Sequence, residues 1–193
     1  MSTQEEFVAF PKIARLSRDI LVTEKIDGTN AQILIRELEG YVAKDAVAVV
    51  GDLALYAGSR SHWVTPEADN FGFARWVKDH AEELAGLGPG RHFGEWWGCG
   101  IQRRYDLKEK RFSLFDTSKW ETKPACCHVV PTLYKGPFSE EAIQRVMVAL
   151  GANGSVAAPG FMRPEGIVIY HIAARVGFKK TFEKDDTGKE EGS

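Results

Sequence analysis

Cysteine and long apolar runs are both scarce in this sequence. Its 193 residues include only three cysteines, Cys99 and the adjacent pair Cys126 and Cys127. This number and spacing suit neither an even disulfide framework nor a paired zinc site, so we interpret all three as free thiols in a reducing compartment. No apolar run approaches the ~20 residues that span a membrane, and the polar residues 2–6 lack the features of a signal peptide. We therefore expect a cytoplasmic protein without a membrane contact.

A strong net charge is also missing. The 25 lysines and arginines nearly balance the 27 aspartates and glutamates, which leaves a net charge of −2. The surface as a whole therefore does not attract polyanions, and any contact with nucleic acid must be local. One basic segment, residues 103–111, contains five cations, two anions and Tyr105. It could follow a phosphate backbone and stack on a base, although a solvated loop between strands is a common alternative.

The composition is 44% hydrophobic and 27% charged, as in an ordinary globular domain. No repeat or Pro/Gly/Ser linker divides the chain, so we expect one domain over residues 1–182 and a polar tail over 183–193. Few of the apolar runs are separated by a helix long enough for a parallel crossover, which favours an α+β fold of antiparallel β-sheets with flanking helices. The predicted strands are at residues 20–25, 31–37, 41–50, 53–58, 91–97, 111–116, 127–133, 166–172 and 175–182.

Two helices are expected outside these strands. The first is predicted to start at Thr65 as its cap, with Pro66 at the first helical position, and to carry apolar residues at helical spacing as far as Leu84. The second is predicted to start at Ser139 and to stop at Gly151, with one apolar face. Both apolar stripes are typical of helices that pack on a core.

The most informative run of the sequence follows the predicted strand at residues 20–25; it is Lys25, Ile26, Asp27, Gly28, Thr29, Asn30. A lysine at a strand end becomes a nucleophile only when its ammonium group loses a proton, which burial and neighbouring cations favour. Gly28 would let the backbone approach a phosphate closely. A surface turn between two strands is the alternative, because Asp-Gly is a common hairpin pair.

Five further segments carry polar residues inside or next to apolar strands. A charged group against an apolar strand is costly unless it is paired, so each of these residues has either an ionic partner or a functional role. For any single segment, a salt bridge is the simpler explanation. The order of all of them behind Lys25 favours the functional role. The segments are Ser59 to Ser61, Glu95 among aromatic residues, Phe115 with Asp116, Glu165 before Gly166, and Lys179 with Lys180.

In this order the segments resemble the motifs of the covalent nucleotidyltransferase superfamily of polynucleotide ligases and messenger-RNA capping enzymes. Lys25, Asp27 and Gly28 match its Lys-x-Asp-Gly nucleophile motif. Thr29 and Asn30 are similar to the branch of RNA ligase 2-like ATP-dependent RNA ligases, as is the Phe-Pro-Lys-Ile run at residues 10–13. The resemblance spans residues 10–182 and implies a ligase-type adenylyltransferase domain.

The resemblance implies a role for each matched residue around the nucleotide. Lys25 would attack the α-phosphorus of ATP and hold AMP as a phosphoramidate. Glu24 would read the adenine edge and Phe115 would stack on the adenine ring. Glu95 would bind the ribose hydroxyls, and Asn30 would lie near the ribose or the acceptor nucleic acid.

The remaining roles concern phosphate and metal. By the same resemblance, Arg60 would approach the nucleotide and the incoming phosphate end, and Lys179 and Lys180 would contact the α-phosphate. Glu165, with Asp27, would hold Mg²⁺ or Mn²⁺, which suits a shell of carboxylate, phosphate and water oxygens. Lysines and a metal ion would stabilise the negative charge that gathers on phosphorus in the transition state.

The sequence departs from the family pattern near its end. The closing motif usually has two lysines separated by one residue, whereas Lys179 and Lys180 are adjacent. Alternation along a strand lets only one of them face the site, and we favour Lys179, which follows Phe178. Only 13 residues follow Lys180, so we expect no appended oligonucleotide-binding or helical domain.

Three functions are compatible with these observations. The first is an ATP-dependent RNA ligase, which transfers AMP to a 5′-phosphate and seals it to a 3′-hydroxyl of nicked or broken RNA, as in RNA repair. The second is a nucleotide-binding module that self-adenylylates but does not seal alone, which the short chain end and the small net charge favour. The third is a DNA ligase or guanylyltransferase, because both share the lysine motif. The sequence leaves the oligomeric state open.

Overall fold

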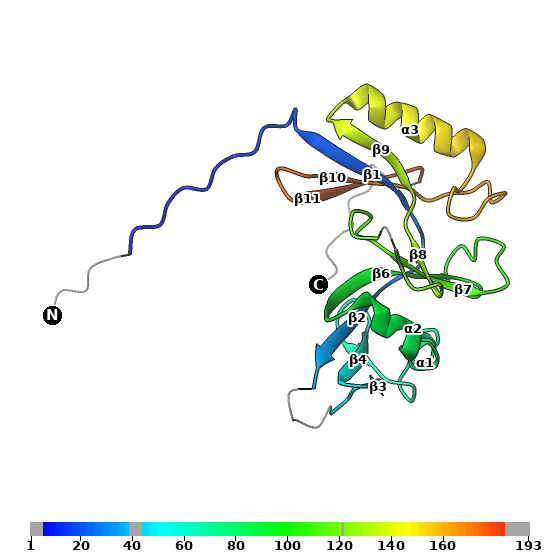
Figure 1. Ribbon diagram of the computed structural model, residues 1–193. Helices are drawn as coiled ribbons and strands as arrows, with labels where there is room; N and C mark the ends of the chain where they lie inside the picture. The colour runs from blue at the N-terminus through cyan, green and yellow to red at the C-terminus, as the bar shows by residue number, and fades with distance from the viewer. Residues whose placement is uncertain (1–5, 39–43, 121, 184–193) are drawn as a thin grey trace, which may run out of the picture.

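The computed structural model describes residues 6–38, 44–120 and 122–183. Two β-sheets lie one above the other in Figure 1; β1 (Asp19–Lys25) belongs to the upper sheet and β2 (Thr29–Glu37) to the lower one. The other elements, in chain order, are β3 (Ala48–Val50), β4 (Leu53–Gly58), β5 (Trp63–Val64), α1 (Phe73–Asp79), α2 (Ala81–Leu84), η1 (Ala85–Leu87), β6 (Gly90–Gly98), β7 (Lys110–Leu114), β8 (Cys127–Val129), β9 (Thr132–Pro137), α3 (Glu140–Asn153), β10 (Gly166–His171) and β11 (Val176–Thr181).

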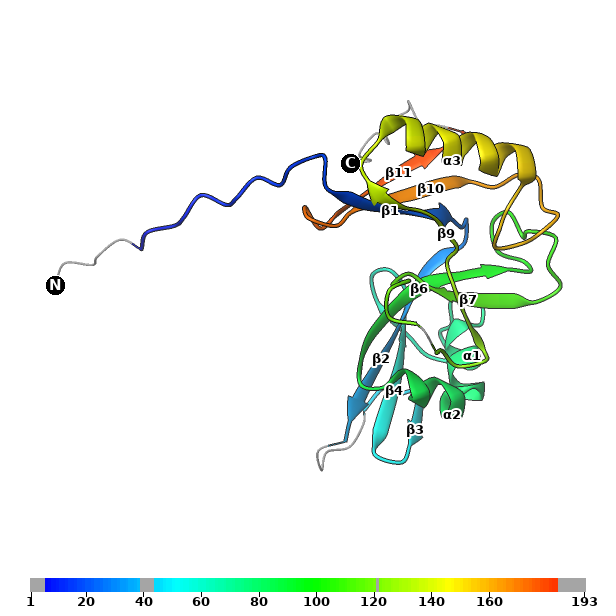
Figure 2. The same ribbon diagram turned by 45° about the horizontal axis from the view of Figure 1, so that its top comes forward.

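The smaller sheet has the strand order β11-β10-β1-β9, and all of its pairs are antiparallel. Helix α3 covers one face of this sheet (Figure 2). Ile143, Met147 and Leu150 of the helix share an apolar cluster with Ile20 of β1 and Ile167 of β10. Residues that alternate with Ile20 and Ile167 along their strands point to the opposite face, and Lys25 is one of them.

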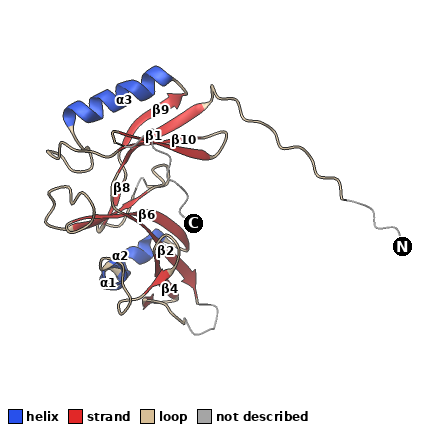
Figure 3. Cartoon of the chain, turned by 180° about the vertical axis from the view of Figure 1, so that it is seen from behind, coloured by secondary structure: helices blue, strands red, loops and turns tan. Residues whose placement is uncertain are grey.

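The larger sheet has the strand order β3-β4-β2-β6-β7-β8, and β5 pairs with β4. Helices α1 and α2 pack on one face of it (Figure 3). They bury Phe73, Val77 and Leu84 in one cluster with Ile33 of β2 and Trp96 of β6. The residues that alternate with Ile33 and Trp96 form the opposite face, which we call the open face of the large sheet.

The chain passes between the two sheets at β1 to β2 and again at β8 to β9. Residues 26–28 make the first connection, and Val130 with Pro131 makes the second. A separate apolar cluster lies at this junction and includes Ile26, Trp97, Tyr105 and Val130. Packing at the junction therefore fixes the backbone directly after Lys25.

The structure confirms the predicted α+β fold of mainly antiparallel sheets with few helices. The predicted strand at residues 53–58 agrees with β4 at both ends. One strand pair, β7 with β8, is parallel and so departs from the antiparallel expectation. Strand β5 has only two residues and is missing from the predicted set, because two residues carry no periodic signal.

Two of the predicted strands are wrong in extent. Of the predicted strand at 41–50, β3 covers only Ala48–Val50; residues 44–47 are not in a strand, and 41–43 lie outside the described residues. The predicted strand at 127–133 is divided into β8 and β9, which belong to different sheets. Pro131 between them has no amide hydrogen to donate, so it interrupts the ladder where the chain changes sheets.

The predicted start of the first helix is also wrong. The hydroxyl of Thr65 accepts from the Ala68 amide in a turn, and α1 begins only after Gly72, whose φ is 81°. Such a φ favours glycine and does not occur inside a right-handed helix. The carboxylate of Asp69 instead accepts from the amides of Ala74 and Arg75, at 2.8 and 3.0 Å, and so satisfies free donors of the first turn.

The second helix begins as predicted. The Ser139 hydroxyl accepts from the Ala142 amide at 3.2 Å, as a cap does. The predicted stop at Gly151 is wrong, because α3 continues to Asn153. The residue with a left-handed φ of 80° is Gly154, which follows the helix and donates its amide to the Leu150 carbonyl.

The division into a domain at 1–182 and a tail at 183–193 stays a prediction, because the described chain ends at residue 183. Among the helices of the described residues, none is both long and apolar enough to cross a membrane.

Candidate active site

Lys25 is the last residue of β1 and lies opposite Gly166 of β10. Its Nζ donates to Oε1 of Glu165 at 2.7 Å, and the two side chains are 25% and 17% exposed. A Cβ at position 166 would lie 2.1 Å from the carbonyl oxygen of Lys180, so only glycine fits there. The pairing of β1 with β10 puts Glu165, the residue before Gly166, at the end of β1, where it meets the candidate nucleophile.

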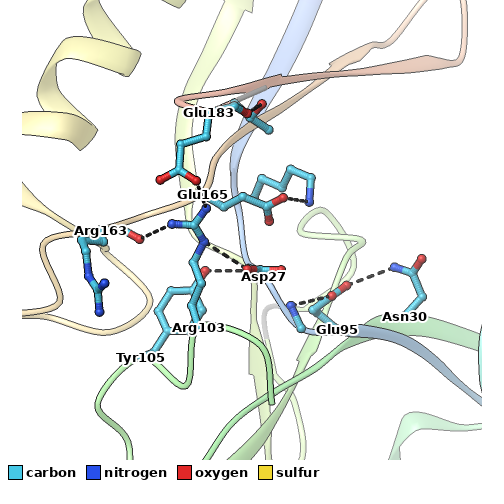
Figure 4. A network of polar contacts seen from close by, with 11 residues as sticks. Asp27, Asn30, Glu95, Arg103, Tyr105, Arg163, Glu165 and Glu183 are labelled. Atoms are coloured by element: carbon cyan, nitrogen blue, oxygen red, sulfur yellow. Dashed lines mark hydrogen bonds and ion pairs between the residues drawn. The ribbon is translucent and has the colours of Figure 1, made fainter. Parts of the chain in front are cut away.

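Glu95 of β6 lies beside the same junction. Its Oε1 accepts from the Gly28 amide and its Oε2 from Nδ2 of Asn30, both at 3.0 Å (Figure 4). Burial raises the pKa of Glu95 to about 7, and the positive charge of Lys25 opposes that rise. A Cβ at position 28 would meet the Trp96 carbonyl at 2.5 Å. The close passage of β6 therefore explains why a glycine is needed at position 28. The predicted approach of Gly28 to a phosphate stays a prediction.

Asp27 is held by two partners from the segment at 103–105. Nε of Arg103 lies 3.0 Å from Oδ2 of Asp27, and the Asp27 amide donates to the Tyr105 hydroxyl at 2.7 Å (Figure 4). Arg103 also donates to the Arg163 carbonyl at 3.2 Å and pairs with Glu183 at 3.5 Å. The guanidinium of Arg103 therefore joins the connection after Lys25 to the chain on either side of β10 and β11.

Tyr105 has a structural role. The hypothesis that it stacks on a base is wrong, because the side chain is only 2% exposed and packs against Trp97 and Phe161. The backbone has positive φ at Arg104, Tyr105 and Asp106, which turns the ring inward. The alternative interpretation of the basic segment, a loop between strands, agrees better with this geometry.

Glu24, the residue before Lys25, lies on the other face of β1 and is 1% exposed. Its Oε1 accepts from the Ser155 hydroxyl at 2.6 Å, and its Oε2 accepts from the amides of Val156 and Ala157 at 2.8 and 2.9 Å. Burial raises the pKa of Glu24, and these hydrogen bonds partly offset that rise. The structure thus gives Glu24 the loop after α3 as its partner, and its predicted contact with an adenine edge stays a prediction.

A cavity of about 590 Å³ opens on the large sheet and brings several predicted residues together. Asn30, Arg60, Phe115 and Asp116 all line it. Phe115 is 40% exposed, so part of its side chain is open to a ligand in this cavity. Asn30 also bonds Glu95, and Glu95 accepts from the Gly28 amide. Hydrogen bonds therefore link the lining of the cavity to the backbone that follows Lys25.

The strand register separates the two closing lysines. Lys179 lies opposite Val168, and Lys180 lies opposite Ile167. Ile167 belongs to the cluster under α3, so Lys180 shares the α3 side of the small sheet. Val168 lies opposite the residue two positions before Lys25, which puts Lys179 on the face of Lys25. The register therefore favours Lys179 as the lysine that faces the candidate site. Contact of either lysine with a phosphate stays a prediction.

A family model described as RNA ligase matches residues 18–187. The chain belongs to the RNA ligase family. The matched range includes every predicted site residue from Glu24 to Lys180. No curated protein sequence matches this RNA ligase family member significantly.

The RNA ligase family member is similar to solved structures of an RNA ligase from Naegleria gruberi. An apo mutant has a TM-score of 0.56 at 20% identity, over 86% of this chain and 50% of that chain. A mutant with AMP and Mn has a TM-score of 0.57 at 20% identity and the same coverage. A mutant with ATP and Mn has a TM-score of 0.56 at 19% identity, over 87% and 51%. The chain spans about half the length of these structures, and the likeness shows the fold.

The residues of this family member fit a divalent metal ion at Glu165. Whereas Oε1 accepts from Lys25, Oε2 of Glu165 is buried and has no hydrogen-bond partner. A buried carboxylate oxygen without a donor suits Mg²⁺ or Mn²⁺, directly or through water. In residues 6–38, 44–120 and 122–183, no three His, Cys, Asp or Glu side chains form a metal-binding group. The ion would therefore take most of its ligands from phosphate and water, and Asp27 would have to share its carboxylate with Arg103.

Sequence reasoning missed Arg103, which holds Asp27, and Ser155, which holds Glu24. Both contacts join residues far apart in the chain. The basic run at 103–111 marked Arg103 as unusual, but it gave no partner. No sequence pattern marked Ser155.

The pKa of Glu95 makes stability depend on pH. The carboxyl has a pKa of about 7 in the folded chain, whereas the ordinary value for a glutamate is 4.5, so between these values the folded chain binds more protons than the unfolded chain. The free energy of unfolding contributed by Glu95 therefore falls as pH rises from 4.5 to 7, by at most about 3 kcal/mol. The Glu95→Gln variant has no titrating group there and should lack this fall.

Urea unfolding of the wild-type chain and of Glu95→Gln at a series of pH values would measure this pH dependence of the free energy of unfolding. The wild-type chain should lose stability relative to Glu95→Gln between pH 4.5 and 7. Parallel curves for the two proteins across that range would contradict the expected pKa.

Proposed function

We propose that the chain is an ATP-dependent RNA ligase that carries AMP covalently on Lys25. The observation that carries this proposal is the pairing of Lys25 with Glu165 at 2.7 Å, at the junction of the two sheets and beside the buried Glu95. The ion pair is only partly exposed, and the junction core holds the backbone on which it sits. Membership of the RNA ligase family supports the same reaction class.

In the first step, the Lys25 ammonium loses a proton, and Oε1 of Glu165 is the acceptor within hydrogen-bond distance. The lone pair of Nζ then forms a bond to the α-phosphorus of ATP, the bond to the pyrophosphate oxygen breaks, and a second Nζ proton leaves to the released pyrophosphate or to water. The products are lysyl-AMP and pyrophosphate. A divalent ion at Glu165 would neutralise phosphate charge during this step.

The next two steps return the lysine to its free state. An oxygen of an RNA 5′-phosphate attacks the same phosphorus, the P–N bond breaks, and Lys25 takes up a proton. A 3′-hydroxyl then attacks the activated 5′-phosphate and gives up its proton to water; the phosphoanhydride bond to AMP breaks, a phosphodiester forms and AMP leaves. Arg60 and Lys179 are the proposed cations for these phosphates, because both lie on the faces that border the junction.

The cavity beside Asn30 is the proposed nucleotide site. It offers the exposed ring of Phe115 for stacking on adenine and the guanidinium of Arg60 for a phosphate. Asn30 lines this cavity and bonds Glu95, which supports the proposal that this amide and carboxylate meet the hydroxyl groups of a ribose.

The proposal is tested with wild-type protein, ATP labelled on the α-phosphate, and Mg²⁺ or Mn²⁺. We expect label on the protein, competition by ATP but not GTP, and release of label to an RNA with a 5′-phosphate. Joining is then measured on nicked duplexes whose 3′ end is ribose or deoxyribose. Preference for ribose supports an RNA ligase, whereas label from GTP, or equal sealing of DNA, would assign the chain to a guanylyltransferase or DNA ligase instead.

A module that self-adenylylates but does not seal alone is the second candidate. The chain spans about half the length of the matched RNA ligase structures, so sealing by these residues is measured separately from self-adenylylation. Stable lysyl-AMP without joined product, on nicked and single-stranded RNA alike, would identify this function.

A further inference from the structure

A row of side chains on the open face of the large sheet leads from the proposed nucleotide site, whose lining includes Phe93 and Gln32, outward to Trp63, which does not line it. The register places Phe93 of β6 opposite Gln32 of β2, Gln32 opposite Gly58 of β4, and Gly58 opposite Trp63 of β5. Phe115 extends the row on the other side, because its amide donates to the Phe93 carbonyl at 3.0 Å. Directly opposite residues share one face of a sheet, so these side chains form a single row.

The aromatic members of this row are exposed. Phe93 is 52% exposed, Trp63 is 46% exposed and Phe115 is 40% exposed. Single exposed apolar side chains are common, but three aromatic rings in one row on a sheet face are typical of a binding surface. Gly58 contributes by its lack of a side chain, because a Cβ there would lie 2.8 Å from Gln32. Between Phe93 and Trp63 the Gln32 side chain therefore occupies the space beside Gly58.

Positive charge lies along the same row. The guanidinium of Arg91 is 5.4 Å from the centre of the Trp63 ring and donates to Oε1 of Gln32. Arg60 follows β4 and is exposed. In the ion pairs found among the described residues, neither Arg91 nor Arg60 has a carboxylate partner. Exposed rings with arginines fixed beside them can stack on bases and neutralise phosphates.

We propose that Phe93, Trp63 and Arg91 bind unpaired nucleotides of the RNA strand next to the break, which extends the proposed function to its acceptor. Neighbouring strands are about 4.8 Å apart, so Phe93 and Trp63, three strands apart, are separated by roughly 14 Å. Stacking needs splayed bases, because paired bases hide their faces in a duplex. The row therefore selects single-stranded RNA at the break and leads it toward Phe115 and Arg60.

Anisotropy of a labelled single-stranded RNA with a 5′-phosphate tests this on the full chain. We expect Trp63→Ala and Phe93→Ala each to raise Kd roughly 5- to 100-fold, and Trp63→Phe to restore binding to within a few-fold. Phe71→Ala is the matched control, because Phe71 is 47% exposed but precedes α1 on the other side of the sheet. Fully paired RNA should bind all variants alike.

RNA binding by this row can be tested separately from the transfer of AMP to Lys25. Trp63 does not line the nucleotide cavity, so Trp63→Ala should keep wild-type self-adenylylation and a wild-type melting temperature while it loses sealing of single-stranded ends. Unchanged Kd in Trp63→Ala and Phe93→Ala would overturn the proposed RNA surface, as would equal weakening of duplex binding. Absence of lysyl-AMP on the wild-type chain would instead overturn the proposed function.

Discussion

Replacement of Lys25 by alanine is expected to abolish self-adenylylation, with a loss of at least roughly a thousandfold in rate. The variant removes the amine that would bond to phosphorus. Lys179 lies on the same face of the small sheet, but on β11, beyond β10. It is therefore not in position to replace an amine that is paired at 2.7 Å with Glu165. The measurement is transfer of label from ATP to protein, followed by gel electrophoresis.

Two further variants separate the nucleophile from the ion pair. Lys25→Arg keeps a cation for Glu165, yet a guanidinium is not deprotonated in proteins, so this variant should also take up no label. Lys78→Ala removes an exposed lysine of α1 and should label as the wild type does. Label on Lys25→Ala at the wild-type rate would show that AMP is carried elsewhere or not covalently.

The sequence predicts elements well where local chemistry decides the conformation. The apolar run of β4 and the serine cap of α3 are such cases. It fails where one backbone angle or one missing donor decides, as at Gly72 before α1 and at Pro131 between β8 and β9. The Thr-Pro pair predicts a helix start before Gly72, and the apolar run predicts one strand through Pro131. In both cases the tertiary structure overrides the local signal.

In the candidate site, too, the sequence marks some residues, whereas their partners are visible only in the fold. Residue types and their order mark Lys25, Glu95 and Glu165 as candidates, because a carboxylate beside an apolar strand is costly without a partner or a role. Their partners depend on the fold: Lys25 and Glu165 are 140 residues apart, and Arg103 and Asp27 are 76 apart. No local pattern encodes such distances, so the role of Arg103 becomes visible only in three dimensions.

The hydrogen-bond partners of Glu24 favour a structural role for this residue over the predicted contact with adenine. Its carboxylate holds one hydroxyl and two backbone amides of the segment at 155–157, almost completely out of contact with water. Glu24→Ala is expected to lower the free energy of unfolding by about 4 kcal/mol, because buried donors without an acceptor cost about 1–3 kcal/mol each. Urea unfolding at pH 7 measures this loss. The exposed Glu140→Ala at the start of α3 provides the control, since it removes a carboxylate of similar size from water.

The conservative variant Glu24→Gln distinguishes the structural role of Glu24 from adenine recognition. Its amide keeps one oxygen acceptor but replaces the other by a donor that faces either the Ser155 hydroxyl or the amides of Val156 and Ala157. If the residue acts through this loop, Glu24→Gln should lose part of the stability while ATP remains preferred over GTP. If Glu24 reads the base, stability should be nearly unchanged and the preference should shift. The hydrogen bonds favour the first result, because both carboxylate oxygens already have donors. Unchanged stability in both Glu24 variants would show that those bonds contribute little to the fold.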